Sequence, residues 1–265
     1  MQIFTSLVIL LSLGYLSFAS AGEEGAHLNK KVSPLTRVGY DAGYIITAPL
    51  RMDAHDIKKF LLFSGVTYGL MTMEDRINKN VRQWNYEKIA EFVEPRSSGR
   101  VTNSEYAYGL GAGIGAVYLY GLAARDIKLQ ETILLVIEAS AINSISTIGL
   151  KYIFGRPRPY QTDYDRDDFY PFSGLNGFPS GHTSSAFTVA QVVSRQYPTR
   201  WVKIPAYTLA ALLGFQRIYS ASHGAGDVFA SAMLGMWVGD TICNLDKAWK
   251  NDDILVFSNG FRIKF

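Results

Sequence analysis

The chain has 265 residues, of which 48% are hydrophobic, and a formal net charge of only +3. This hydrophobic content excludes a largely disordered chain, and the length suits one large domain or two small ones. The small net charge argues against nucleic acid as a partner, because nucleic-acid-binding domains carry a concentrated basic excess. Cys243 is the single cysteine, so no disulfide can form within the chain.

The first 21 residues have the pattern of a secretory signal. Residues 3–16 are almost wholly apolar and uncharged, and Ala19-Ser20-Ala21 offers a small-residue cleavage site before a polar stretch. We therefore predict a signal peptide over residues 1–21 and export to a bacterial periplasm, where a protein with one cysteine fits well. An uncleaved membrane anchor is the alternative, because no Lys or Arg precedes the apolar run.

Residues 22–104 are predicted to form a polar N-terminal arm with one or two helices. The first part, 22–57, has an irregular composition with turn formers at Ser33-Pro34 and Pro49. A short helix is expected near residues 52–60, and residues 61–73 are apolar over about the length of one helix.

From residue 105 to residue 250 helical composition dominates, so the predicted fold class is all-α, a helical bundle. The segments with this composition are 106–124, 129–152, 183–197, 203–220 and 226–250, and a proline-rich loop over 155–180 separates the second from the third. Residues 251–265 alternate around Asn259-Gly260, a pair favoured in two-residue turns, which predicts a small C-terminal β-hairpin or tail.

The helical segments are compatible with two relations to a membrane. Most are shorter than the roughly 20 apolar residues that a span needs, and Glu138 and Asp240 fall in the middle of two of them, which favours a globular bundle. Basic residues nevertheless cluster at one set of helix ends, namely Arg125, Lys128, Arg195, Arg200 and Lys203. This is the bias of an integral protein whose opposite face is periplasmic. A soluble or peripheral protein and an integral one both stay as hypotheses.

Three short motifs in the second half carry the residues suited to binding and attacking a phosphate. They are Lys151-(six residues)-Arg158-Pro159, Pro179-Ser180-Gly181-His182 and Arg217-(five residues)-His223-(three residues)-Asp227. A phosphate is held by fixed cations and backbone N–H donors. Arg158 and Arg217 each offer a planar guanidinium and Lys151 a point charge. For the first motif alone, a charged helix end leading into a solvated loop is the alternative.

The second motif lies where a loop gives way to a helix. Ser180 can cap that helix, Gly181 allows a backbone N–H to approach an anion closely, and His182 would project beside the anion. An ordinary serine cap followed by a surface histidine is the alternative for this motif in isolation.

In the third motif, His223 and Asp227 are four residues apart. A carboxylate on one ring nitrogen of His223 would fix the tautomer and leave the other nitrogen able to attack. A purely structural His–Asp pair is the alternative.

Together, the three motifs resemble the signature motifs of the type 2 phosphatidic acid phosphatase (PAP2) superfamily, which includes lipid phosphatases, bacterial acid phosphatases and vanadium haloperoxidases. The resemblance covers about residues 105–245 and implies a bundle of the PAP2/chloroperoxidase-like type. Gln216 departs from the Ser or Gly common in the family, and we expect this to have little influence.

The resemblance also implies a mechanism that requires no metal and no other cofactor. By position, His223 attacks phosphorus and forms a phosphohistidine, Asp227 orients and stabilises the imidazolium, and His182 protonates the leaving alcohol and then activates water. The phosphoryl oxygens would be held by Lys151, Arg158, Ser180, Gly181 and Arg217.

The expected function is therefore hydrolysis of phosphate monoesters, either a lipid phosphate or a small soluble one, with no nucleic acid involved. One alternative is a vanadium-dependent haloperoxidase, in which vanadate would be the cofactor rather than an inhibitor. The other is a non-catalytic protein that binds phosphate or lipid. The sequence does not distinguish among the phosphate esters, because acid and lipid phosphatases share these residues.

Overall fold

The computed structural model describes residues 34–83, 117, 119–161, 163, 168–251, 254–257 and 260–263. The predicted signal peptide and most of the first predicted bundle helix, 106–124, lie outside the described residues. The chain forms two compact units, one of residues 1–51 with 241–265 and the other of residues 52–240.

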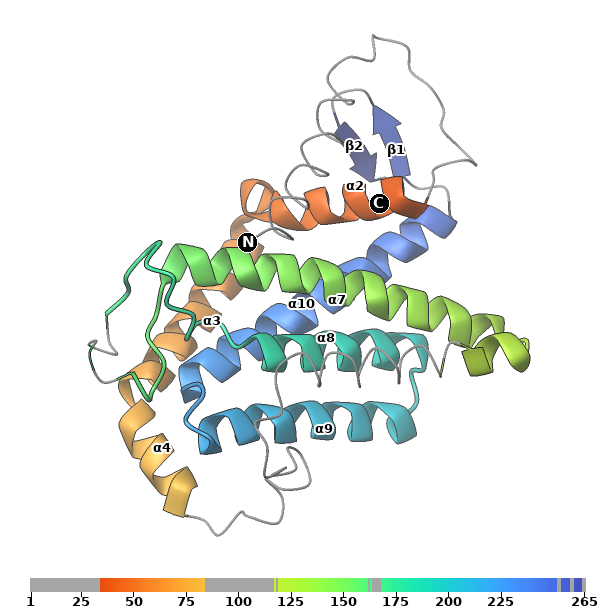
Figure 1. Ribbon diagram of the computed structural model, residues 1–265. Coiled ribbons are helices and arrows are strands. Elements are labelled where there is room, and N and C mark those ends of the chain that lie inside the picture. The colour runs from red at the N-terminus through yellow and green to blue at the C-terminus, as the bar shows by residue number, and fades with distance from the viewer. Residues whose placement is uncertain are drawn as a thin grey trace. The chain divides into compact units, whose positions relative to one another are not determined.

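In the described part of the larger unit, four long helices form a bundle, which confirms the prediction of an all-α bundle (Figure 1). They are α7 (Ile127–Phe154), α8 (Gly181–Gln196), α9 (Arg200–Tyr219) and α10 (Ala225–Lys250), the last of which continues into the smaller unit. Local chemistry sets the ends of α7, because the Asp126 side chain caps its start and Gly155 ends it in a left-handed conformation (φ 57°).

Successive helices alternate in direction, so that four helix ends meet at one end of the larger unit. In Figure 1 the C-terminal ends of α7 and α9 and the N-terminal ends of α8 and α10 lie on the same side. Helix α8 packs against both α7 and α9. Gly235 of α10 lets this helix approach α8 closely, since a Cβ there would lie 2.2 Å from the Ser184 carbonyl oxygen. The three motifs are therefore carried to one place by the helix directions.

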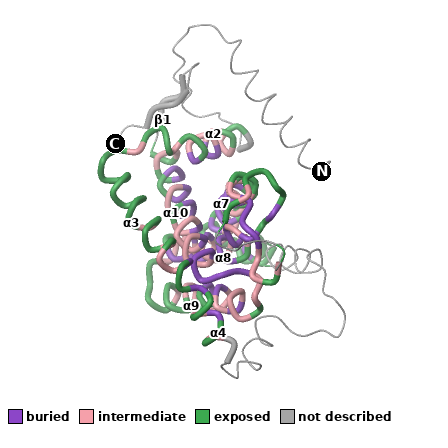
Figure 2. The backbone as a smooth tube through the Cα atoms, turned by 90° about the vertical axis from the view of Figure 1, so that its left-hand side faces the viewer, coloured by how far each residue is buried: buried purple, intermediate pink, exposed green. Residues whose placement is uncertain are grey.

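Two further helices of the larger unit, α3 (Ala54–Thr72) and α4 (Glu74–Gln83), precede the bundle. The short helix predicted near 52–60 and the apolar run 61–73 form one continuous helix, α3, capped by Asp53. Most of α3 is exposed in Figure 2. Its last turn lies against the start of α10, where a Cβ on Gly226 would come within 2.4 Å of Met71 Cγ. Glu74 follows directly and is buried.

The smaller unit contains α2 (Pro34–Ile46), the short 3₁₀ helix η1 (Ala48–Arg51), the last ten residues of α10 and a pair of strands. The irregular composition of residues 22–57 did not indicate the helix α2. Tertiary contacts explain the helix: Trp249 Nε1 donates to Asp41 Oδ1 at 2.9 Å, and Arg37 pairs with Asp246 at 2.8 Å. Such long-range contacts override weak local helix propensity.

The strands β1 (Ile254–Phe257) and β2 (Gly260–Ile263) pair antiparallel, with Ile254 opposite Ile263 and Phe257 opposite Gly260. They occupy the segment for which the sequence predicts a hairpin. Asn259, on which that prediction rests in part, lies outside the described residues.

Candidate active site

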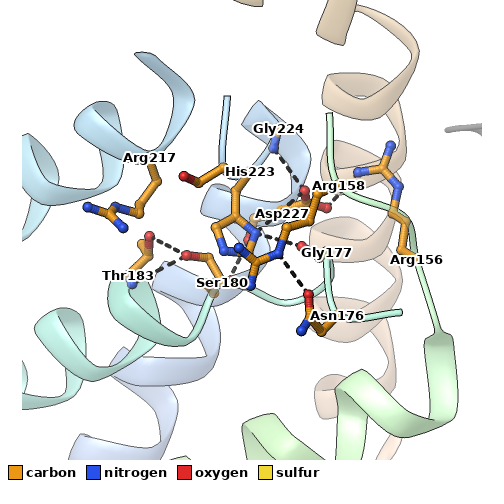
Figure 3. A network of polar contacts seen from close by, with 12 residues as sticks. Arg156, Arg158, Asn176, Gly177, Ser180, Thr183, Arg217, His223, Gly224 and Asp227 are labelled. Atoms are coloured by element: carbon orange, nitrogen blue, oxygen red, sulfur yellow. Dashed lines mark hydrogen bonds and ion pairs between the residues drawn. The ribbon is translucent and has the colours of Figure 1, made fainter. Parts of the chain in front are cut away.

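The structure brings the three motifs together at the end of the bundle where the four helix ends meet (Figure 3). Lys151 is in the last turn of α7, and Arg158 follows in the loop. Ser180 caps the start of α8, and Arg217 is in the last turn of α9. His223 and Asp227 flank the start of α10 and complete the group.

His223 is buried, and its tautomer is set by a backbone carbonyl. Its Nδ1 lies 2.7 Å from the carbonyl oxygen of Gly177. Since a carbonyl oxygen only accepts hydrogen bonds, Nδ1 carries the proton and Nε2 carries the lone pair. His223 is therefore held in the tautomer that a nucleophilic Nε2 requires.

Asp227 does not make the hydrogen bond to His223 that the sequence predicts, because its carboxylate is engaged elsewhere. One oxygen, Oδ1, lies 2.6 Å from Nη1 of Arg156, and the other, Oδ2, accepts from the Gly224 N–H at 2.8 Å. The distance from Oδ2 to His223 Nδ1 is 4.0 Å. Asp227 is thus close enough to act on a charged His223 electrostatically, while Gly177 makes the direct contact.

Burial and neighbouring charge keep His223 neutral. Removal of the ring from water lowers the pKa of His223 to about 3, and the positive charges of Lys151, Arg158 and Arg217 act in the same direction. The hydrogen bond to Gly177 opposes this shift without cancelling it. At neutral pH the imidazole therefore keeps its lone pair.

The cations are held in place by neutral oxygens. Arg158 donates from Nε to the side-chain Oδ1 of Asn176 at 2.7 Å, and Lys151 donates from Nζ to the backbone oxygen of the same residue at 2.5 Å. Arg217 donates from Nε to Oε1 of Gln216 at 2.5 Å. These amides fix the side chains without removing their charge. From the sequence we expected Gln216 to have little influence on the site, and its contact with Arg217 was not predicted.

At the start of α8, the predicted serine cap is confirmed. The Ser180 hydroxyl accepts from the Thr183 N–H at 3.5 Å and lies 3.0 Å from the Thr183 hydroxyl, and the Ser180 N–H donates to the Ser231 hydroxyl at 2.6 Å. His182 is the second residue of the helix and is exposed. Among the described residues, a Cβ on Gly181 would meet Thr147 Cγ2 alone, at an ordinary 3.7 Å.

Sequence reasoning missed a buried ionic triad beside His223. Arg156 Nη2 pairs with Glu74 Oε2 at 2.8 Å, and Arg156 Nη1 pairs with Asp227 Oδ1 at 2.6 Å. All three side chains are at most 3% exposed. The available signal was a second arginine two residues before Arg158, in a stretch fixed by prolines. Nothing in the sequence pointed to Glu74, which is 82 residues away from Arg156.

No group of three or more His, Cys, Asp and Glu side chains able to hold a metal ion occurs within the described part of the chain. The buried carboxylates of Glu74 and Asp227 converge on the guanidinium of Arg156.

The sequence around the three motifs matches a known family. Residues 132–248 match the model of the PAP2 superfamily, and this segment contains all three motifs. By this match, residues 132–248 form a segment of the PAP2 superfamily type. Glu74 lies outside it.

The chain is also similar to two named relatives and to two solved structures. The chain is 37% identical over 116 residues to a lipid A 1-phosphatase and 28% identical over 101 residues to a lipid A 4'-phosphatase, both from Porphyromonas gingivalis. These matches cover 43% and 37% of this chain but only 22% and 43% of the relatives, so the chain spans less than half the length of either.

Among solved structures, LpxE from Aquifex aeolicus matches with a TM-score of 0.48 and 24% identity, over 65% of this chain and 95% of that protein. A transmembrane PAP2-type phosphatidylglycerolphosphate phosphatase from Bacillus subtilis matches with a TM-score of 0.38 and 17% identity, over 80% and 96% respectively.

Proposed function

We propose that this protein is a phosphatase that hydrolyses phosphate monoesters of lipids through a phosphohistidine at His223. The observation that carries the proposal is the state of that histidine. It is buried and neutral, with Nδ1 committed to the Gly177 carbonyl, and the charges of Lys151, Arg158 and Arg217 act on it. A nucleophile with a lone pair on Nε2, surrounded by fixed cations, suits attack on an anionic phosphate.

In the first half of the proposed reaction, the Nε2 lone pair of His223 forms a bond to phosphorus. The bond from phosphorus to the leaving oxygen breaks, and that oxygen takes a proton from His182. The cations balance the charge that develops on the phosphoryl oxygens, together with N–H groups at the start of α8. The exposed position of His182 suits a group that exchanges protons with an alcohol and with water.

In the second half, His182 takes a proton from a water molecule, and the water oxygen attacks phosphorus. The bond between phosphorus and Nε2 breaks, so that free phosphate leaves and His223 regains its lone pair. Between the two halves the ring of His223 is cationic. Its Nδ1–H donates to Gly177, and the Asp227 carboxylate lies 4.0 Å away, which stabilises that charge.

A lipid phosphate is the substrate class that we favour. The matched relatives are named as lipid A phosphatases, which supports a phosphorylated glycolipid as the first substrate to test. Large apolar side chains are exposed along α3, among them Phe60, Leu61 and Leu62. By length and composition α7 and α10 could cross a membrane, a property they share with core helices of water-soluble proteins. We propose membrane association, with export to the periplasm.

The test of the function is a substrate panel with purified protein. The panel holds lipid A, phosphatidylglycerophosphate, phosphatidate, undecaprenyl diphosphate and a soluble aryl phosphate. The proposal expects phosphate release from at least one lipid and loss of that release in His223→Asn, whose Nδ2–H can still donate to the Gly177 carbonyl. Hydrolysis of the aryl phosphate alone would indicate a soluble acid phosphatase.

Two other outcomes would support the alternatives. Bromide oxidation with peroxide after addition of vanadate, without phosphate release, would establish a haloperoxidase. Binding of phosphate without turnover of any ester would establish a binding protein. Fractionation of cells with and without detergent tests membrane association separately, because release by salt alone would exclude an integral protein.

A further inference from the structure

The Glu74–Arg156–Asp227 triad lies directly against the segment that carries His223. Arg156 bridges the two carboxylates through its two terminal nitrogens, at 2.8 Å and 2.6 Å. Glu74 also touches the chain next to His223: a Cβ on Gly224 would fall 0.8 Å from Glu74 Oε1. Figure 3 shows Arg156, Asp227, Gly224 and His223 in this arrangement. The carboxylate of Glu74 therefore occupies the space that a side chain at 224 would need.

The triad carries a net charge of −1, because it combines two carboxylates with one guanidinium. Lys151, Arg158 and Arg217, by contrast, place positive charge near His223. Those cations favour binding of an anion but disfavour a cationic imidazole, which the proposed reaction forms at His223. Arg156 alone would cancel the charge of Asp227, and the second carboxylate, from Glu74, restores a negative charge beside the ring.

We propose that Glu74 and Arg156 are positioning residues of the active site, an inference that rests on the proposed phosphatase function. Arg156 holds the Asp227 carboxylate 4.0 Å from His223, and Glu74 keeps the triad negative so that it stabilises the imidazolium of the phosphohistidine. Glu74 comes from α4, outside the segment that matches the superfamily model. Helix α4, which precedes the bundle, is thus part of the catalytic unit.

The competing explanation is that Glu74 and Arg156 only stabilise the fold. The two explanations differ in what they predict for ligands that do or do not make the His223 ring cationic. Orthovanadate that bonds to Nε2 leaves the ring of His223 cationic, as phosphoryl transfer does, whereas inorganic phosphate binds as an anion without that bond. Glu74→Gln keeps the size of the side chain and removes its charge. Loss of a negative charge should weaken the vanadate complex and leave phosphate binding unchanged or tighter.

The experiment measures vanadate and phosphate affinities, kcat and KM for the wild type and Glu74→Gln. We expect about tenfold weaker vanadate binding and about tenfold lower kcat, with KM and phosphate affinity within twofold of the wild type. Glu74→Asp retains the charge and should retain the wild-type ratio of vanadate to phosphate affinity. This second variant keeps the test available if Glu74→Gln folds poorly.

Asp41→Asn provides the matched control. Asp41 is also a buried carboxylate near an arginine, with Oδ2 3.6 Å from Arg37 Nε, but it belongs to the smaller unit. The Asp41→Asn substitution should lower thermal stability and leave the ratio of vanadate to phosphate affinity unchanged. If Glu74→Gln weakens both anions equally, or neither, the positioning role is wrong. A wild type that neither turns over phosphate esters nor binds either anion would instead overturn the proposed function.

Discussion

Two kinds of arginine stand within one short loop of this protein. Arg156 is buried and paired with the carboxylates of Glu74 and Asp227, whereas Arg158, two residues later, is half-buried and held by the amide oxygen of Asn176. Arg217 has the same kind of contact as Arg158, from its Nε to the amide oxygen of Gln216. Carboxylates and amide oxygens both fix the orientation of a guanidinium. The carboxylates also neutralise its charge, whereas the amide oxygens do not.

The difference indicates how a single site can be both well ordered and strongly cationic. Burial on its own would lower the pKa of Arg156, and the charges and hydrogen bonds of Asp227 and Glu74 together raise it, so this arginine stays charged inside the protein. Arg156 is thus a buried structural side chain whose positive charge is balanced by the two carboxylates. An amide oxygen orders Arg158 without adding a negative charge, which suits a side chain whose task is to meet a phosphate.

The largest effect is expected from Arg156→Met. The substitution leaves the buried carboxylates of Glu74 and Asp227 without their cation, which should lower the free energy of unfolding by about 3–5 kcal/mol. The melting temperature should fall by roughly 10 °C. Thermal unfolding followed by circular dichroism measures this, with Arg158→Met as the control. An equal fall in melting temperature in both variants would show that Arg156 is no more important for stability than Arg158.

A second effect concerns acid stability through His223. Its pKa is about 3 in the folded protein and 6.5 in an unfolded chain, so between these values the unfolded state binds the proton more readily. The free energy of unfolding should therefore fall as the pH drops from 6.5 towards 3, by on the order of 4 kcal/mol in total. Above pH 6.5 this contribution is constant.

Denaturant unfolding across this pH range, compared with His223→Asn, isolates the effect. The asparagine can donate to Gly177 but does not titrate, so the variant should show a shallower loss of stability in acid. Identical slopes for the two proteins would mean that the histidine is not held neutral by its surroundings.

A third effect is expected from Arg158→Ala, which should weaken anion binding without lowering the stability of the fold. Removal of one charged hydrogen-bonding group from a phosphate site costs about 1.5–3 kcal/mol, which corresponds to roughly 10- to 100-fold weaker affinity. Calorimetric titration with inorganic phosphate measures it, and the melting temperature should stay within about 2 °C of the wild type. Unchanged phosphate affinity would exclude Arg158 from the site.

Asn176→Asp turns the amide that holds Arg158 into a carboxylate and so makes this arginine resemble Arg156. The fold should be retained, while phosphate affinity falls about tenfold because the new charge competes with the anion. Asn176→Ala serves as the comparison, since it removes the contact without adding charge. A stronger loss in the alanine variant would show that order matters more than charge at this position.

The smallest effect is expected from Gly181→Ala. The nearest described atom to a Cβ there is Thr147 Cγ2, at an ordinary van der Waals distance of 3.7 Å, so stability should change by less than about 1 kcal/mol. If a phosphoryl group lies close to this backbone, kcat/KM should still fall several-fold. Unaltered kinetics would remove Gly181 from the phosphate-binding residues.

The sequence predicts the bundle well because its signals are local. Helices α7 to α10 begin and end within three residues of the predicted segments, at the Asp126 cap, at Gly155 and at the Ser180 cap. The motif residues then meet because successive helices alternate in direction, which brings alternate helix ends together even across the long loop between α7 and α8.

The contacts within the site are not predictable in this way. Which of the 23 acidic residues pairs with Arg156 depends on packing between α4 and the loop after α7. The pairing of His223 with Asp227, at helical spacing, was the natural prediction. It is not the direct contact, because Arg156 and the Gly224 N–H take the carboxylate and the Gly177 carbonyl takes the ring. Asn176 and Gln216 have no sequence pattern that marks them as partners of arginines.

The central claim, that His223 is the covalent phosphate acceptor, can be tested by trapping. In His182→Ala, an aryl phosphate whose leaving group needs no proton should phosphorylate the enzyme, while the water step is slow. We predict that alkaline quench and mass spectrometry find phosphate on His223 in this variant and none on the protein in His182→Ala/His223→Asn. Phosphate on another residue, or rapid phosphate release without any phosphorylated protein, would contradict the account.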